Sequence, residues 1–178
     1  MAVYPLHILT GLLGPVRRVS AFTARTRDRF DSDSGEIAVD VDDNWQILLD
    51  FGAAVLGWVY AGNCTISTRV PQLEIQGYAG TLTASLLDVS APLHIQSAER
   101  GWETLDVPHE RESCPDHILG IAHLADIILG IAHLADIVLD GAQPILTVDH
   151  ALHVVEIIEK AARSSREGRV FDIEHTDF

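Results

Sequence analysis

Apolar and polar positions alternate along much of the first part of the chain, which is the period-two pattern of strands with one covered face. The polar trio at residues 42–44, Asp-Asp-Asn, is typical of a hairpin turn, because Asp and Asn tolerate left-handed backbone angles. Strands are expected at residues 17–27, 36–41, 45–51, 53–59, 64–70, 73–77, 81–87, 92–97 and 104–107, with a polar turn region at 28–35 and a short last strand at 170–173.

Helical spacing of apolar residues marks both ends of the chain. The first helix is predicted from four leucines at helical spacing, Leu6, Leu9, Leu12 and Leu13. It is expected to end at the Gly14-Pro15 pair. Another helix is expected at residues 148–164, with Gly168 as its C-terminal cap. Its predicted core-facing stripe consists of Ala151, Leu152, Val155, Ile158 and Ala162.

The order of these elements, strands first and helices later, predicts the α+β class. We expect a large, mostly antiparallel open sheet with helices packed on one face. A chain of 178 residues fits one domain, so residues 1–178 are taken as a single α+β domain.

An exact tandem repeat lies in the helical part, where ILGIAHLADI occupies residues 118–127 and again residues 128–137. Ten residues turn a helix by about 1000°, which leaves the second copy's face about 80° away from the first. A straight helix therefore cannot present both copies to one sheet. We expect residues 128–137 to fill the groove on the sheet and residues 118–127 to lengthen the helix and contact a second chain.

The same apolar run is long enough to cross a membrane, but polar residues interrupt it. These residues are His123, Asp126, His133 and Asp136. Each Asp would cost about 3 kcal/mol at the bilayer centre, so no membrane insertion is expected.

Composition narrows the function classes further. An apolar fraction of 47% excludes a disordered chain. A net charge of −14, from 26 acidic and 12 basic residues, argues against a general affinity for nucleic acid or anionic lipid. Cys64 and Cys114 are too few for a disulfide scaffold and are interpreted as free thiols in the reducing cytoplasm.

Common catalytic and cofactor motifs are absent from the sequence, which holds no G-x-G-x-x-G turn, P-loop, G-x-S-x-G elbow or Cys-x-x-Cys pair. The His-x-x-Asp pairs at 123–126 and 133–136 place two side chains on one helix face, but two ligands make at most half a metal site. His150 is expected to be exposed and His153 partly buried. The chain alone is predicted to hold no catalytic residue, no cofactor site and no metal site.

Several segments together resemble the C-terminal domain of the glucose–fructose oxidoreductase / inositol dehydrogenase / MocA (Gfo/Idh/MocA) family. Residues 73–82, LEIQGYAGTL, are similar to that family's LEI-x-G-x-x-GTL strand–turn–strand, and residues 3–16 to the helix after its catalytic Asp. Residues 43–51 and 151–170 match in order and spacing, and one copy of the repeat resembles the short helix before the family's Gly-x-x-Pro turn.

The resemblance implies a substrate pocket that this chain forms only in part. Family members begin with a nucleotide-binding Rossmann domain and carry a Glu-Lys-Pro motif, and this sequence contains neither. The family's Asp-x-x-x-His-x-x-Asp signature aligns its His with Tyr4 and its second Asp with His7, so these two residues are identified as pocket remnants.

The implied function is that of an isolated substrate-binding and oligomerisation domain from an NAD(P)-dependent sugar or polyol oxidoreductase, not catalytic alone. A homo-oligomer is expected through the open sheet face and the repeat helix. The alternative is a duplicated or engineered non-enzymatic scaffold fragment that serves folding and self-assembly. A third hypothesis is a membrane or metal-binding module built on the repeat. The resemblance specifies neither the substrate nor the choice between NAD and NADP.

Overall fold

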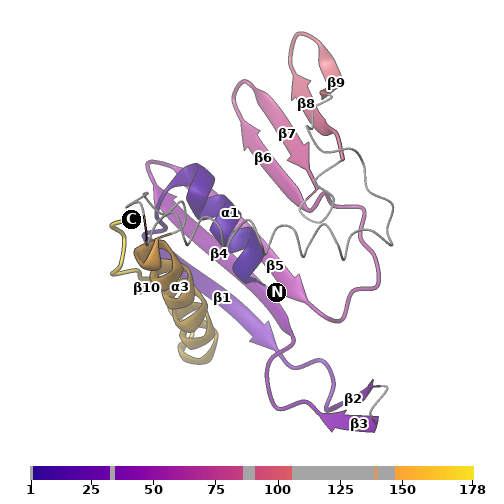
Figure 1. The fold of residues 1–178 in the computed structure, drawn as a ribbon, viewed down its shortest axis with the longest axis vertical. Helices are drawn as coiled ribbons and strands as arrows, with labels where there is room; N and C mark the ends of the chain where they lie inside the picture. Colours follow the sequence, from indigo (N-terminus) through magenta and orange to yellow (C-terminus); the bar gives the residue numbers. More distant parts are fainter. Residues whose placement is uncertain (1, 33–34, 86–90, 106–138, 140–146) are drawn as a thin grey trace. The chain divides into compact units, whose positions relative to one another are not determined.

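A computed structural model describes residues 2–32, 35–85, 91–105, 139 and 147–178 of the chain (Figure 1). The chain divides into two compact units. The first contains residues 1–67 and 146–178, and the second contains residues 68–145.

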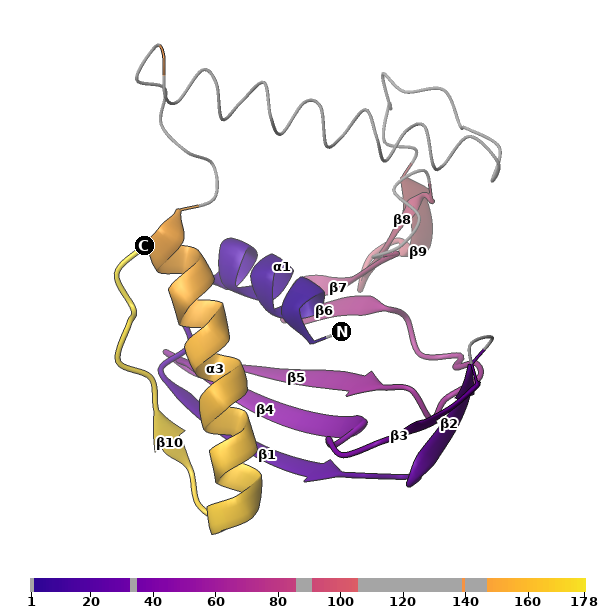
Figure 2. The same ribbon diagram turned by 60° about the horizontal axis from the view of Figure 1, so that its bottom comes forward.

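A four-stranded antiparallel sheet forms the centre of the first unit, in the order β10-β1-β4-β5. Its strands are β1 (Arg18–Ala24), β4 (Asn44–Gly52), β5 (Val55–Gly62) and β10 (Phe171–Asp172). Helices α1 (Val3–Leu13) and α3 (Val148–Glu167) pack on one face of this sheet (Figure 2). The predicted α+β class with antiparallel strands and helices on one face is confirmed.

Alternate residues of the strands fill the core beneath the two helices. The buried apolar residues include Leu6, Leu9, Val16, Val19, Ala21, Ile47, Leu49, Val59, Val154, Ile157 and Ala161. The buried residues of β1 and β4 alternate with exposed or half-buried ones, as strands with one covered face require.

The region between β1 and β4 differs from the expected hairpin. β2 (Arg29–Ser32) and β3 (Gly35–Ala38) pair with each other, and β4 pairs with β1 and β5. The predicted turn region 28–35 therefore contains strand residues. The trio 42–44 does not connect two strands that pair with each other. Its carboxylates instead hold the end of β1, because Asp43 accepts hydrogen bonds from Thr26 and Asp42 accepts one from Thr23.

Two further strand predictions need correction. Residues 64–70 form no strand, and Ile66 is fully exposed there. The alternation of apolar residues in this segment therefore does not correspond to a buried strand face. The strand expected at 53–59 begins later, at Val55, because Ala53 and Ala54 form a turn with φ of 47° and 66°.

Helix α3 ends as predicted but buries a different face. Thr147 caps its first turn by accepting the His150 N–H, and Gly168 follows it with φ of 65°. In the predicted core-facing stripe, Ala151, Leu152 and Val155 are exposed, and Ile158 and Ala162 are half-buried. The face that packs inward consists of His150, His153, Val154, Ile157, Lys160, Ala161 and Ser164.

The edge of β1 explains this orientation of α3. Strand β10 pairs only with Arg18 and Val19, so the N–H groups of Ala21 and Thr23 find no partner there. Ser164 Oγ accepts the Ala21 N–H at 3.1 Å, and Ser165 Oγ accepts the Thr23 N–H at 2.8 Å. Buried N–H groups require such partners, which an apolar stripe could not provide.

The second unit contains another four-stranded antiparallel sheet, in the order β6-β7-β8-β9. Its strands are β6 (Leu73–Gly77), β7 (Gly80–Ala84), β8 (Leu93–Ser97) and β9 (Gly101–Leu105). Three strands lie close to their predicted positions, and the last begins three residues before the predicted 104–107. Gly80 has φ of 155°, and a Cβ there would lie 1.9 Å from Gln96 O, so the turn requires glycine.

The tandem repeat 118–137, with its His-x-x-Asp pairs, and Cys114 lie outside the described residues. Within the part that is described, no helix combines the length and apolar content that a membrane span requires.

The orientation of α3 predicts opposite effects for two adjacent substitutions. Val154 is fully buried and Val155 is 60% exposed. We expect Val154→Asp to lower the free energy of unfolding by about 3 kcal/mol, and Val155→Asp to change it by less than about 0.5 kcal/mol. Urea denaturation of the full chain, followed by circular dichroism, measures both. An equal loss in the two variants would contradict this orientation.

Candidate functional site

The two sequence-predicted pocket residues, Tyr4 and His7, lie one turn apart on α1. Tyr4 is 70% exposed and His7 is half-buried. Leu6, Leu9 and Thr10 hold the opposite side of the helix in the core. Spacing of i, i+3 brings Tyr4 and His7 to the same side of α1, so both can contact one ligand.

His7 lies against a second histidine, His150 of α3. Their ring centroids are 4.9 Å apart and the planes are inclined by 75°, an edge-to-face contact. The Nδ1 atom of His7 is buried, and no group in the described part of the chain hydrogen-bonds to it.

His150 is buried, not exposed as predicted, because it joins α3 to α1. Its Nε2 lies 2.7 Å from Thr10 Oγ1, and the Thr10 hydroxyl donates to Leu6 O at 2.7 Å. The Thr10 proton is thus used, so His150 Nε2 carries the proton of the His150–Thr10 bond. Burial lowers the pKa of His150, and the neighbouring His7 and His153 lower it further.

His153, expected to be partly buried, is fully buried and has partners at both ring nitrogens. Nε2 accepts the Val16 N–H at 3.1 Å, and Nδ1 lies 2.5 Å from His175 O. Burial lowers the pKa of His153 more than the contacts with His175 and Glu156 raise it. The ring is therefore neutral near pH 7, with its proton on Nδ1.

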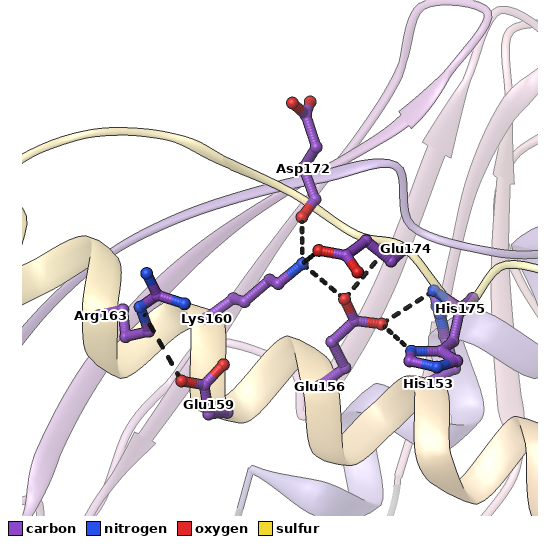
Figure 3. Close-up of polar contacts among 8 residues, drawn as sticks. All are labelled: His153, Glu156, Glu159, Lys160, Arg163, Asp172, Glu174 and His175. Atoms are coloured by element: carbon purple, nitrogen blue, oxygen red, sulfur yellow. Dashed lines mark hydrogen bonds and ion pairs between the residues drawn. The ribbon is translucent and has the colours of Figure 1, made fainter.

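A buried ion-pair network continues along α3 from these histidines (Figure 3). Lys160 Nζ lies 2.6 Å from Glu156, 2.9 Å from Glu174 and 2.7 Å from Asp172 O. Glu156 also accepts from the N–H groups of Glu174 and His175, and from His175 Nδ1, at 2.8 to 2.9 Å.

Burial alone would raise the pKa of Glu156, but hydrogen bonds from Lys160, His175 and Glu174 outweigh it and lower this pKa to about 2. Burial would lower the pKa of Lys160, and its bonds to the two carboxylates raise it instead. Both groups stay charged at neutral pH and hold the chain after β10 against α3. This network is structural, because its oxygens and nitrogens bind one another.

Two hollows open on the surface of the described residues, and neither contains Tyr4 or His7. One, of about 260 Å³, is lined by Ala2, Val3, Asp42, Asp43, Trp45, Ala61, Gly62, Asn63 and Ile158. Hydrogen bonds from Thr26 lower the pKa of Asp43, so this carboxylate already serves the loop. The other, of about 300 Å³, lies over β6, β7 and β8 and has no charged residue in its lining.

Among the described residues, no three His, Cys, Asp or Glu side chains converge as metal ligands. The structure brings His7 together with Thr10, His150 and His153, which the sequence did not predict as a cluster. The available signal was the i, i+3 spacing of His150 and His153, which places them on the same helix face as Val154 and Ile157.

Comparison with known proteins gives a family match for part of the chain. Residues 1–83 match the family model described as the GFO/IDH/MocA C-terminal domain. Among curated protein sequences, none matches.

Solved oxidoreductase structures share the fold. Levoglucosan dehydrogenase, solved with NADH and L-sorbose, has a TM-score of 0.73 at 17% identity, over 98% of this chain and 49% of that one. An oxidoreductase from Agrobacterium radiobacter, solved with NAD+, L-tartaric acid and magnesium, has a TM-score of 0.68 at 21% identity, over 97% and 47%. An NAD-binding oxidoreductase from Klebsiella pneumoniae has a TM-score of 0.71 at 16% identity, over 97% and 49%. The chain spans about half the length of these structures.

The buried network predicts a large effect for one lysine. Lys160→Met leaves the Glu156 carboxylate, whose side chain is 9% exposed, without its cation. We expect the free energy of unfolding to fall by about 3 kcal/mol. Arg29→Met, which removes the exposed pair with Glu36, is the matched control and should cost less than about 1 kcal/mol. Urea denaturation at neutral pH measures the stability of both variants. Equal losses of unfolding free energy would contradict a structural role for Lys160.

Proposed function

We propose that this chain is the C-terminal, substrate-binding and oligomerisation domain of an NAD(P)-dependent oxidoreductase of the Gfo/Idh/MocA family. The observation that carries the proposal is the fold: 97–98% of the chain superposes on about half of each of the three oxidoreductases described above. The family match over residues 1–83 and the L-sorbose bound to one of these enzymes support a sugar or related polyol as substrate.

In this proposal Tyr4 and His7 form one wall of the substrate pocket. A polyol presents several hydroxyl groups, each able to donate and accept a hydrogen bond. The exposed Tyr4 phenol complements such a substrate, and the half-buried His7 lies beside it with no hydrogen-bond partner at Nδ1 among the described residues. Hydride transfer also requires a nicotinamide held against the substrate carbon, and this chain has no sequence motif for binding one. Catalysis therefore depends on a nucleotide-binding domain.

The open face of the first sheet, opposite α1 and α3, is the proposed oligomer contact. Its large exposed residues are Phe22, Leu48, Leu56 and Trp58. The β-register places Leu48 directly beside Trp58, so they form part of one continuous patch. Apolar patches of this kind mark protein interfaces, and a second copy could cover it by two-fold pairing. A contribution from the repeat helix stays a prediction from sequence.

A cytoplasmic location belongs to the same proposal. It rests on the low cysteine content and on Cys64, a free and exposed thiol.

The oligomer contact can be tested with Trp58→Glu. We expect the wild-type chain to have twice its 19.4 kDa monomer mass in light scattering at high micromolar concentration, and the variant to be monomeric. The reason is that a charge at the centre of the patch would be buried without a partner. Tyr78→Glu, an exposed turn residue, is the control and should not change the mass. A wild-type mass near 19.4 kDa would argue against this contact.

The proposed enzymatic role is tested in two ways, with the chain alone and with the chain fused to a nucleotide-binding domain. The chain alone should give no binding heat with NADH or NADPH in calorimetry, because it lacks the glycine-rich turn for the pyrophosphate.

Fused to the nucleotide-binding half of levoglucosan dehydrogenase, the chain should support NAD+ reduction by some member of a sugar and polyol panel. Tyr4→Phe and His7→Ala should each lower kcat/KM by about tenfold or more, as the loss of a substrate hydrogen bond does. Tyr78→Phe is the control. A folded, NADH-binding fusion that oxidises no sugar or polyol would disprove the proposed substrate class.

A further inference from the structure

The last five residues, 174–178, form a strap along the N-terminal half of α3. Figure 2 shows the chain after β10 running beside α3 to the start of that helix. The Phe178 ring stacks on His150 with centroids 4.4 Å apart and planes inclined by 2°, and lies 4.9 Å from the His153 ring. His175 O accepts the Nδ1 proton of His153. Two buried histidines thus provide the docking surface for Phe178, the end of the strap, while Glu156 binds its start at Glu174 and His175.

The hydrogen bonds of His153 are compatible with the neutral ring only. Its Nε2 accepts the Val16 N–H, so a second proton on Nε2 would point at another donor. The ring is fully buried, and a charge there would have no solvent. To become charged, His153 must reach water, and the Phe178 ring of the strap lies against it, with ring centroids 4.9 Å apart.

His150 meets the same constraint. It is 7% exposed, and its ring contacts both Phe178 and His7. A second proton would place a charge beside His7 and His153 in a buried site, with Thr10 as its only hydrogen-bonding side chain among the described residues.

The charged and titratable groups around this pair come from three elements. His7 faces it from α1, Glu156 and Lys160 lie on α3, and Glu174 and His175 lie on the strap. The loop before β1 contributes only the Val16 N–H among the hydrogen bonds to the pair. The His175 imidazole bonds to Glu156 and would bind it more strongly when charged, which favours docking. The His175 side chain of that contact is 55% exposed, which weakens it, whereas the His153 ring is fully buried.

We propose that the end of the strap, residues 176–178, is an acid-sensitive latch, docked on α3 while His150 and His153 are neutral and released when they take up protons. The rest of the first unit stays folded, because α3 is held to β1 by Ser164 and Ser165, which do not titrate. Glu156, with a pKa of about 2, also keeps its charge at mildly acidic pH and continues to bind Glu174 and His175 at the start of the strap.

The direction of the pH dependence follows from linkage. Burial lowers the pKa of both histidines from the ordinary 6.5, so the released state binds more protons than the docked state. Docking is complete above pH 6.5 and is lost progressively as the pH falls below that value.

The test follows backbone amide NMR signals of the ¹⁵N-labelled full chain while the pH is lowered from about 7.5 to 5, the range in which histidines titrate. The amides of residues 176–178 should become sharp and mobile with a midpoint below pH 6.5, while those of Glu174 and His175, bound to Glu156, and those of Ala21 and Thr23 do not change. Loss of all these signals in one step would show global acid unfolding and overturn the latch. Unchanged strap signals would overturn it as well.

Substitutions separate the histidines from other groups. His153→Gln keeps an amide that can accept from Val16 and donate to His175 but cannot be charged, so its release midpoint should fall by at least about one pH unit. His94→Gln removes an exposed histidine on β8 and is the matched control, with no expected shift. An unshifted midpoint in His153→Gln would contradict the proposal.

If His153→Gln does not fold, a second variant tests the latch in its place. Phe178→Ala removes the ring that stacks on His150 and lies 4.9 Å from the His153 ring. It should raise the release midpoint, because the strap then covers the histidines less tightly. A midpoint equal to that of the wild type would overturn the latch.

Discussion

The unpaired N–H groups along the outer edge of β1 determine how the first unit is built. Strand β10 is too short to bond them, so α3 must present hydroxyl groups to Ala21 and Thr23. Ser164 serves two needs, because it accepts from Ala21 and donates to Arg169 O in the turn after the helix. Burying these N–H groups without partners would cost more than exposing a few apolar side chains. The more polar face of α3 therefore packs inward.

The need for a hydrogen-bond acceptor at a buried backbone N–H recurs near the N-terminal end of α3, where a histidine meets it instead of a serine. There the Val16 N–H needs an acceptor, and His153 provides it. An imidazole meets the structural requirement as a serine does, but it also titrates near neutral pH. A backbone requirement thus places ionisable groups between α1, α3 and the strap. His150 extends this link to Thr10 and to the edge of His7, which fixes the α1 wall of the proposed pocket.

The orientation of α3 leaves apolar side chains on two opposite sides of the first unit. Leu152 and Val155 face outward from the helical layer, and Leu48 and Trp58 lie on the open face of the sheet. One flat partner cannot cover both sides. In the proposed enzyme a second copy covers the sheet, which leaves the helical side, with Tyr4 and His7, for the nucleotide-binding half.

The sequence by itself determined the local elements and the α+β class. Period-two alternation identified β1, β4 and β6, and the caps identified the end of α3, because these signals depend on residues close along the chain. Only the tertiary structure decided which strands pair and which face of α3 is buried. The Asp42–Asn44 trio reads as a hairpin turn until Thr23 and Thr26 are seen to occupy its carboxylates. Likewise, the sequence predicts an exposed His150 and a partly buried His153, and only the structure sets Thr10 of α1 and the Val16 N–H before β1 against them. Hydrophobicity along one helix cannot reveal those groups, since they come from segments more than 130 residues away.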